Sequence, residues 1–109
     1  MNLLKSTSKY FITTPIFYVN ASPHIGHLHS ALLADAQSRF RALMGKKEIF
    51  FVTGTDEHGL KIQKAAENLN YLNPEFFCND VSKTYYDLFQ RFDVHHSDFI
   101  RTSSERHKV

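Results

Sequence analysis

The sequence has a single cysteine and no long run of apolar residues. Cys78 alone cannot form a disulfide within the chain, and one cysteine cannot build a cysteine-based zinc knuckle. No apolar run is long enough to cross a bilayer, so we expect no membrane partner. The Gly-x-Gly-x-x-Gly fingerprint of dinucleotide-binding proteins is absent as well. These absences argue against disulfide-stapled, membrane-spanning and dinucleotide-binding classes.

A large excess of either charge is also missing. Thirteen Lys and Arg stand against 11 Asp and Glu, which gives a net charge of +2. That balance is too mild to predict nucleic-acid binding by itself. What the 109 residues do contain is 42% hydrophobic and 14% aromatic side chains. This is enough for one hydrophobic core and argues against disorder.

The first part of the chain predicts a strand, a turn and a helix in succession. Tyr10–Thr14 is aromatic and β-branched, as strands are, and it ends at Pro15, which has no N–H to donate. Ser22 and Pro23 suit the N-cap and first position of a helix, and Gly45 suits its C-terminal end. The apolar residues at helical spacing between them are Leu28, Leu32, Ala36, Phe40 and Leu43.

Two more strands are predicted further along. Glu48–Thr53 is nearly continuous in apolar residues, which is typical of a parallel strand buried on both faces. Gly54–Gly59 follows it as a second turn, and Asp98–Arg101 has the character of a short third strand. Strands joined by crossover helices form right-handed βαβ units. We therefore predict an α/β fold with an open parallel sheet.

Two helices are predicted between the second and third strands. The first carries Leu60, Ala65, Ala66 and Leu69. The second begins at Asn73 as N-cap with Pro74 after it, and its apolar face is Phe77, Val81, Tyr85, Leu88 and Phe92. Thr102 and Glu105 predict a capping box that opens a last helix, which stops at Val109. So short a helix is not stable alone, and three short strands leave a sheet edge uncovered. We therefore expect the front part of a larger fold or a truncated product.

The first turn carries the residues with the clearest chemistry. His24 and His27 share one face at the start of a predicted helix, at the carboxyl end of the first strand, where open α/β sheets bind ligands. A helix N-terminus attracts phosphate, and imidazole donors can tighten on an oxyanion as charge develops. Gly26 has no side chain, so a flat ring or a phosphate can approach the backbone. This equipment suits nucleotidyl transfer.

Plainer interpretations stay open from the residues alone. A His-x-x-His pair also occurs on solvated surfaces and occasionally as a metal pair, although no third ligand has recognisable spacing here. Gly54–Gly59 with Lys61 is a near miss of a P-loop, but its Gly-Lys-Ser/Thr order is broken and two acidic side chains would repel phosphate. Tyr18 and Ile16 could simply pack in the core, and Asp56 could cap the following helix.

Several of these stretches resemble one family. His24-Ile25-Gly26-His27 is the signature tetrapeptide of class I aminoacyl-tRNA synthetases. The stretches Thr13–Asn20 and Thr53–Gly59 resemble methionyl-tRNA synthetases specifically, and Asp98–Thr102 matches as well. Within that family, Leu28–Ala36 is most similar to the mitochondrial branch. Many synthetases share the tetrapeptide, whereas both turns at this separation are highly specific.

The resemblance implies a Rossmann-like open parallel sheet with crossover helices, with residues 10–109 as the N-terminal part of the catalytic nucleotide-binding domain. It implies that His24 and His27 are catalytic, because they would hold the ATP phosphates and stabilise the transition state. The ATP-binding residues it implies are Pro15, Tyr18, Asn20, His24, Gly26 and His27. The methionine-binding residues it implies are Ile16, Tyr18, Asp56 and His58.

The implied reaction is that of a methionine–tRNA ligase. The methionine carboxylate attacks the α-phosphate of ATP, pyrophosphate leaves, and the acyl group passes from the adenylate to the terminal ribose of tRNA(Met). Mg²⁺ accompanies ATP, and any zinc knuckle would lie beyond Val109. The Lys-Met-Ser-Lys-Ser loop and the tRNA-binding regions of the family are absent from this sequence. We therefore expect these 109 residues alone not to aminoacylate tRNA.

The sequence also leaves more than one possibility for the state of the chain and for its location. It could be a catalytically inactive short form that only binds nucleotide or a partner, or part of another class I synthetase. The resemblance implies the mitochondrial matrix, with a bacterial cytoplasm as the second possibility. Residues 1–9 are basic, hydroxyl-rich and free of acids, which fits either a flexible terminus or a short targeting remnant.

Overall fold

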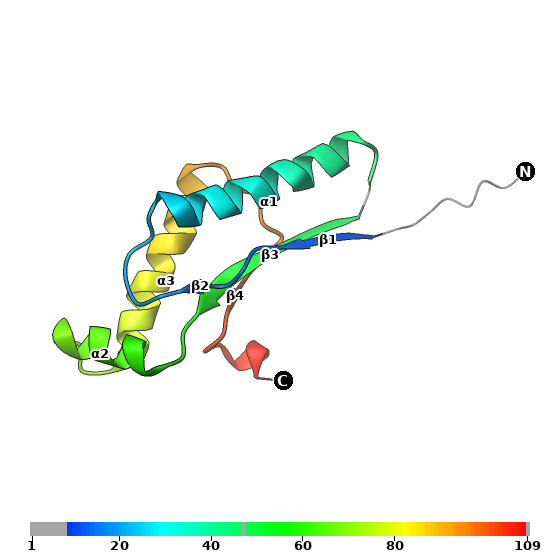
Figure 1. Cartoon of the computed structure of the whole chain (residues 1–109). Coiled ribbons are helices and arrows are strands. Elements are labelled where there is room, and N and C mark those ends of the chain that lie inside the picture. Colours follow the sequence, from blue (N-terminus) through cyan, green and yellow to red (C-terminus); the bar gives the residue numbers. More distant parts are fainter. Residues whose placement is uncertain (1–8, 47, 109) are drawn as a thin grey trace, which may run out of the picture.

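The computed structural model describes residues 9–46 and 48–108 (Figure 1). Apart from Lys9, the predicted flexible or targeting segment 1–9 lies outside the described residues. The elements in chain order are β1 (Tyr10–Thr13), β2 (Phe17–Tyr18), α1 (Ile25–Leu43), β3 (Ile49–Asp56), α2 (Leu60–Asn68), α3 (Pro74–Arg91), β4 (Asp98–Arg101) and a 3₁₀ turn, η1 (Glu105–His107).

Strand β3 is the centre of a parallel sheet, and the other three strands all pair with it. Strands β1 and β2 lie along one edge of β3, near its start and its end, and Pro15 lies in the gap between them. Strand β4 lies along the other edge, because Val52 pairs with both Thr13 and Asp98. The predicted α/β fold with a parallel sheet and crossover helices is therefore confirmed.

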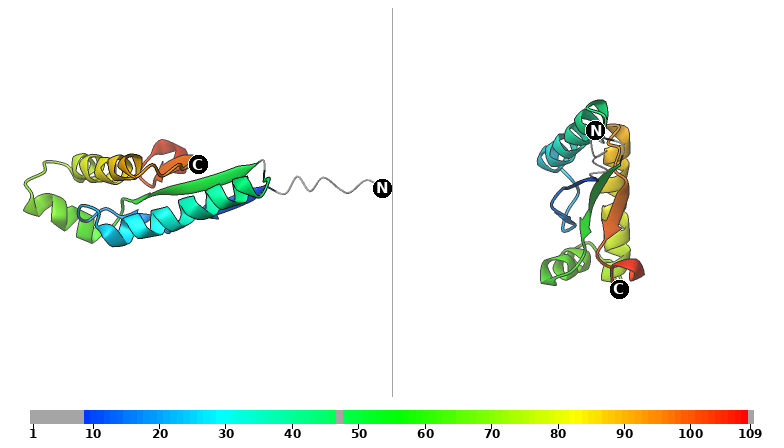
Figure 2. Two further views of the ribbon diagram at one scale, coloured as in Figure 1. Left: turned by 90° about the horizontal axis from the view of Figure 1, so that it is seen from above. Right: turned by 90° about the vertical axis from the view of Figure 1, so that its right-hand side faces the viewer.

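Helices α1 and α3 cover the same face of this sheet. The Phe17 ring of β2 lies 5.5 Å from the His27 ring of α1 and 5.7 Å from the rings of Tyr85 and Phe89 in α3. The reason is geometric, because right-handed crossovers that step in one direction across a sheet place their helices on one side. Figure 2 shows β3 and β4 side by side. On the opposite face, Phe11 and its neighbour Phe50 are 65% and 45% exposed.

Strand β3 is longer than the sequence predicts. The predicted strand ended at Thr53, whereas β3 continues to Asp56. It continues because β2 pairs with its end, with Phe17 opposite Thr55 and Tyr18 opposite Asp56. A two-residue strand is too short to show an alternating pattern of apolar and polar residues, so the sequence did not predict β2. The second turn is correspondingly shorter, and Asp56 belongs to the sheet.

The predicted apolar face of α1 was largely wrong. Of its five members only Leu28 is buried, while Leu32, Phe40 and Leu43 are 37%, 50% and 86% exposed. The helix instead turns Ala31, Ala34 and Asp35 inward. Asp35 can be buried because its carboxylate accepts hydrogen bonds from Arg39 Nε at 2.7 Å and from the backbone N–H of His95 at 2.9 Å. Small residues and a satisfied carboxylate thus form the packed face.

The later helices match the sequence better. Asn73 caps α3 as predicted, with its Oδ1 accepting from Glu75 N at 2.9 Å. Phe77, Val81 and Tyr85 are buried as predicted, but Phe89 takes the inward place expected of Phe92. In α2 the inward residues are Ile62 and Ala66, whereas Leu60 and Leu69 are about two-thirds exposed.

The predicted capping box at the end of the chain was wrong. Only the short 3₁₀ turn η1 forms there, with Ser104 as its N-cap. The hydroxyl of Thr102 accepts a hydrogen bond from the backbone N–H of Glu57 at 2.8 Å instead. The local pattern assigned this hydroxyl to the start of a helix, but the hydroxyl binds a backbone N–H that lies 45 residues away in the sequence.

Candidate functional site

The start of α1 is built from its two histidines. His24 is the N-cap, with φ −126° and ψ 179°, so the predicted start at Ser22 and Pro23 lies two residues too early. His24 Nδ1 accepts a hydrogen bond from Gly26 N at 3.0 Å, and His27 Nδ1 accepts one from His24 N at 3.0 Å. The two imidazoles thus do what hydroxyl or carboxylate caps usually do, because they satisfy N–H groups that a helix start leaves unpaired.

The two rings lie close together at this helix end. Their centroids are 3.9 Å apart, His24 is exposed and His27 is half-buried. Burial lowers the pKa of His27, and the neighbouring His24 lowers it further, because a second positive charge beside the first is unfavourable. At neutral pH His27 therefore serves as an uncharged donor and acceptor at a helix N-terminus.

The second turn meets the first at the carboxyl edge of the sheet. Tyr18 and Asp56 are the last residues of the adjacent strands β2 and β3, and they are paired in register. Gly59 has φ +121°, and a Cβ there would lie 2.7 Å from the Tyr18 hydroxyl. The Tyr18 hydroxyl therefore lies in space that only a glycine at position 59 leaves open.

The other predicted site residues lie on the surface or are held by a hydrogen bond. Pro15, Ile16, Asn20 and Gly26 are exposed, and Ile16 at 47% is not a core residue, so core packing does not explain it. His58 is held by a hydrogen bond to Thr102, with its Nε2 3.1 Å from the carbonyl oxygen of that residue.

Asp56 does not cap the following helix. Its Oδ1 accepts from His58 N at 3.3 Å, within the turn itself. The N-cap of α2 is Gly59, which offers no side chain to the helix. The interpretation of Asp56 as a helix cap was therefore wrong.

A buried ion pair that the sequence did not predict holds the second turn. The Glu57 side chain is fully buried, and Arg101 donates to its carboxylate from Nη2 at 2.6 Å and from Nε at 2.9 Å. Arg101 also donates to Asn79 Oδ1 at 2.6 Å. Forty-four residues separate Glu57 from Arg101, so no local spacing could have revealed the pair.

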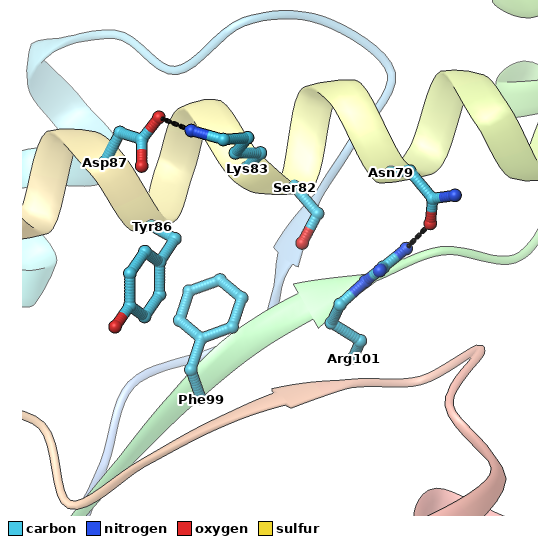
Figure 3. Close-up of a pocket in the computed structure, with 7 residues that line it drawn as sticks. All are labelled: Asn79, Ser82, Lys83, Tyr86, Asp87, Phe99 and Arg101. Atoms are coloured by element: carbon cyan, nitrogen blue, oxygen red, sulfur yellow. Dashed lines mark hydrogen bonds and ion pairs between the residues drawn. The ribbon is translucent and has the colours of Figure 1, made fainter.

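A pocket of about 430 Å³ lies between α3 and β4, and Arg101 of this ion pair is one of its lining residues (Figure 3). Tyr86 and Phe99 meet edge to face in it, with ring centroids 5.6 Å apart. Lys83 pairs with Asp87 along the helix. None of the predicted site residues lines this pocket.

Metal ligands and membrane spans are two further features that bear on function. Within residues 9–46 and 48–108, no three His, Cys, Asp or Glu side chains gather closely enough to hold a metal ion. No helix in that part of the chain is both long and apolar enough to cross a membrane.

The structure combines a parallel sheet, a His-x-x-His helix cap at the carboxyl edge of that sheet, and a neighbouring strand that ends in a carboxylate. Together these features define the class of nucleotide-binding synthetase domains that the motifs resemble. The model of the family described as tRNA synthetases class I (M) matches residues 10–109. The chain therefore belongs to this family of class I tRNA synthetases, which confirms the resemblance of the two turns.

Known relatives agree with this assignment. The chain is 55% identical over 101 residues to the mitochondrial methionine–tRNA ligase of Homo sapiens, covering 91% of this chain and 17% of that protein. It is 52% identical over 103 residues to the mitochondrial enzyme of Candida albicans, covering 94% and 18%. The structure of Mycobacterium tuberculosis methionyl-tRNA synthetase in complex with methionyl-adenylate matches with a TM-score of 0.86 at 35% identity, covering 92% and 19%. The chain thus spans less than a fifth of the length of these relatives.

Proposed function

We propose that this chain is part of a methionine–tRNA ligase, which activates methionine with ATP and transfers it to tRNA(Met). The observation that carries the proposal is the reciprocal histidine cap of α1, placed at the carboxyl edge of the sheet beside Tyr18 and Asp56. Residues 10–109 are the N-terminal part of the catalytic nucleotide-binding domain, and the tRNA binds through regions outside this sequence.

His24 and His27 are the catalytic residues in this proposal. Both use Nδ1 to accept backbone N–H groups, which leaves Nε2 of each ring to donate to ATP phosphate oxygens. The positive end of α1 adds to this field. Gly26 lets the adenine approach the backbone. Pro15, Tyr18 and Asn20 complete the ATP-binding residues.

The methionine side of the site is the end of β2 and β3. Asp56 supplies a carboxylate for the substrate ammonium, which needs an opposite charge when it leaves water. Tyr18 and the half-exposed Ile16 supply an aromatic and apolar wall for the thioether. His58 is the remaining methionine-binding residue in this proposal.

The reaction needs little covalent chemistry from the protein. A methionine carboxylate oxygen forms a bond to the α-phosphorus of ATP, and the bond to the pyrophosphate oxygen breaks. The histidine donors stabilise charge on the phosphate oxygens during this exchange, and the binding residues hold the two substrates in line. Mg²⁺ enters with ATP as part of the substrate.

The location of the protein follows from its relatives in this proposal. The human and Candida albicans proteins are named as mitochondrial enzymes, which favours the mitochondrial matrix. A methionine–tRNA ligase of the bacterium Rickettsia bellii is also 46% identical over 99 residues, which keeps a bacterial cytoplasm as the second possibility.

Binding of a non-hydrolysable methionyl-adenylate analogue tests the proposal. We expect the chain to bind the analogue and the combined substitution His24→Ala and His27→Ala to weaken binding more than tenfold, because two charge-assisted donors are lost. Isothermal titration calorimetry measures both. His29→Ala is the matched control, since His29 is exposed on the same helix outside the cap. Failure of the unsubstituted chain to bind, or equal binding by the double variant, would contradict the proposed site.

The contact between Gly59 and Tyr18 gives a second prediction. Gly59→Ala is expected to weaken analogue binding about tenfold, because the new Cβ pushes the Tyr18 hydroxyl away from its place. Adding Tyr18→Phe removes the atom that the Cβ meets, so the double variant is expected to bind better than Gly59→Ala alone. If Tyr18→Phe gives no rescue, backbone strain at φ +121° explains the loss and the contact does not.

A further inference from the structure

The hydroxyl of Tyr85 is a buried polar group that the proposed reaction does not use. The side chain of Tyr85 is fully buried in α3, where its ring stacks on Phe17 at 5.7 Å and meets the edge of His27 at 5.2 Å. Its oxygen lies 3.4 Å from His27 Nδ1. A buried tyrosine hydroxyl needs a hydrogen-bond partner, and the burial that raises the pKa of Tyr85 keeps it protonated at neutral pH.

The direction of this hydrogen bond follows from the cap. His27 Nδ1 already accepts the backbone N–H of His24 at 3.0 Å, so Nδ1 must carry a lone pair and no proton. Tyr85 can then only donate to it, as a second donor that shares the single lone pair of Nδ1. A neutral imidazole has one N–H, which in His27 must be on Nε2. The opposite arrangement, with a proton on Nδ1 given to the Tyr85 oxygen, would break the bond to His24 N.

We propose that Tyr85 is a positioning residue, which acts together with the backbone N–H of His24 to hold the proton of His27 on Nε2, so that this ring presents a donor to a phosphate oxygen. That the anion is an ATP phosphate rests on the proposed function. Phe17 and Tyr85 wall the His27 ring at 5.5 and 5.2 Å and limit its rotation. The titratable groups that face His27 are His24 from the cap and Tyr85 from α3. Tyr85 thus links α3 to the helix start 58 residues earlier.

Nitrogen-15 NMR of the histidine rings tests this assignment in the full chain, with His27→Gln to identify the signals. In the unsubstituted chain we expect the Nε2–H form of His27. Tyr85→Phe removes one of the two donors to Nδ1 of the neutral ring, so it is expected to raise the pKa of His27 and to increase the share of the Nδ1–H form. Tyr86→Phe is the matched control, because Tyr86 is the next residue of the helix and is 42% exposed. It is expected to leave the His27 signals unchanged.

Two results would overturn the proposal. The first is an Nδ1–H form of His27 in the unsubstituted chain, which no folding defect of a variant can mimic. The second is a His27 pKa that stays the same or falls in a folded Tyr85→Phe chain. ATP titrated into the same samples separates this proposal from the proposed function. We expect about fivefold weaker ATP binding for Tyr85→Phe, as for one lost hydrogen bond. An unsubstituted chain with the expected tautomer and no ATP binding would contradict the function alone.

Discussion

Replacing Arg101 with methionine is expected to lower the free energy of unfolding by about 3–5 kcal/mol. The Glu57 side chain is fully buried, and Arg101 holds its carboxylate through two short hydrogen bonds. Methionine keeps much of the apolar stem of arginine but carries no charge, so the carboxylate stays in the interior without its partner. Urea unfolding followed by circular dichroism measures the difference.

Two further variants test whether the loss of stability comes from the unpaired buried charge or would follow from breaking any ion pair. Arg106 pairs with Asp98 at 2.7 Å, but these side chains are 56% and 39% exposed, so Arg106→Met is expected to lower the free energy of unfolding far less than Arg101→Met does. Adding Glu57→Gln to Arg101→Met removes the buried charge itself and is expected to recover most of the loss. Equal losses for Arg101→Met and Arg106→Met would contradict this account.

The features that the sequence predicted well have local causes. Asn73 followed by Pro74 predicts the start of α3, because the cap and the fixed φ of proline act within one turn. Gly45 ends α1 with φ +86°, a conformation that glycine adopts without strain. The short strand Asp98–Arg101 also has its predicted bounds. At the two helix ends the deciding contact lies within a few residues, whereas the strand keeps its predicted bounds by pairing with β3.

The sequence-based predictions were wrong where a residue far away in the sequence determines the local structure. Asp35 is buried in α1 because the backbone of His95, 60 residues later, donates to it. Thr102 caps no helix because Glu57 N takes its hydroxyl. Strand β2 exists only because the end of β3 lies beside it. Such partners have no fixed spacing, so neither propensity nor periodicity reports them.

For the site, the sequence predicted residue types better than it predicted their geometry. The resemblance selected His24 and His27, but it did not show that each imidazole accepts a backbone N–H at the helix start. The residue pattern predicted a turn over Gly54–Gly59 and so placed Asp56 in a loop, whereas Asp56 ends a paired strand. This difference matters chemically, because a strand fixes a carboxylate more rigidly than a loop does.

The last prediction concerns a glycine inside the sheet. Gly54 lies within β3, opposite Ile100 of β4. A Cβ on Gly54 would lie 1.9 Å from the carbonyl oxygen of Ile100 and 2.7 Å from its carbonyl carbon. These are backbone atoms of a paired strand, so they cannot yield unless β3 and β4 separate. Gly54→Ala is therefore expected to lower the free energy of unfolding by about 3 kcal/mol or more, measured by urea unfolding.

Gly45→Ala is the matched control for Gly54→Ala, because it adds the same methyl group where no heavy atom lies within 4 Å. It is expected to cost about 1 kcal/mol of backbone strain at φ +86°. Gly54→Ala is also expected to abolish binding of the adenylate analogue, since Asp56 lies two residues further along the displaced strand. Equal destabilisation by both substitutions would mean that backbone freedom, rather than the contact with Ile100, explains the glycine in β3.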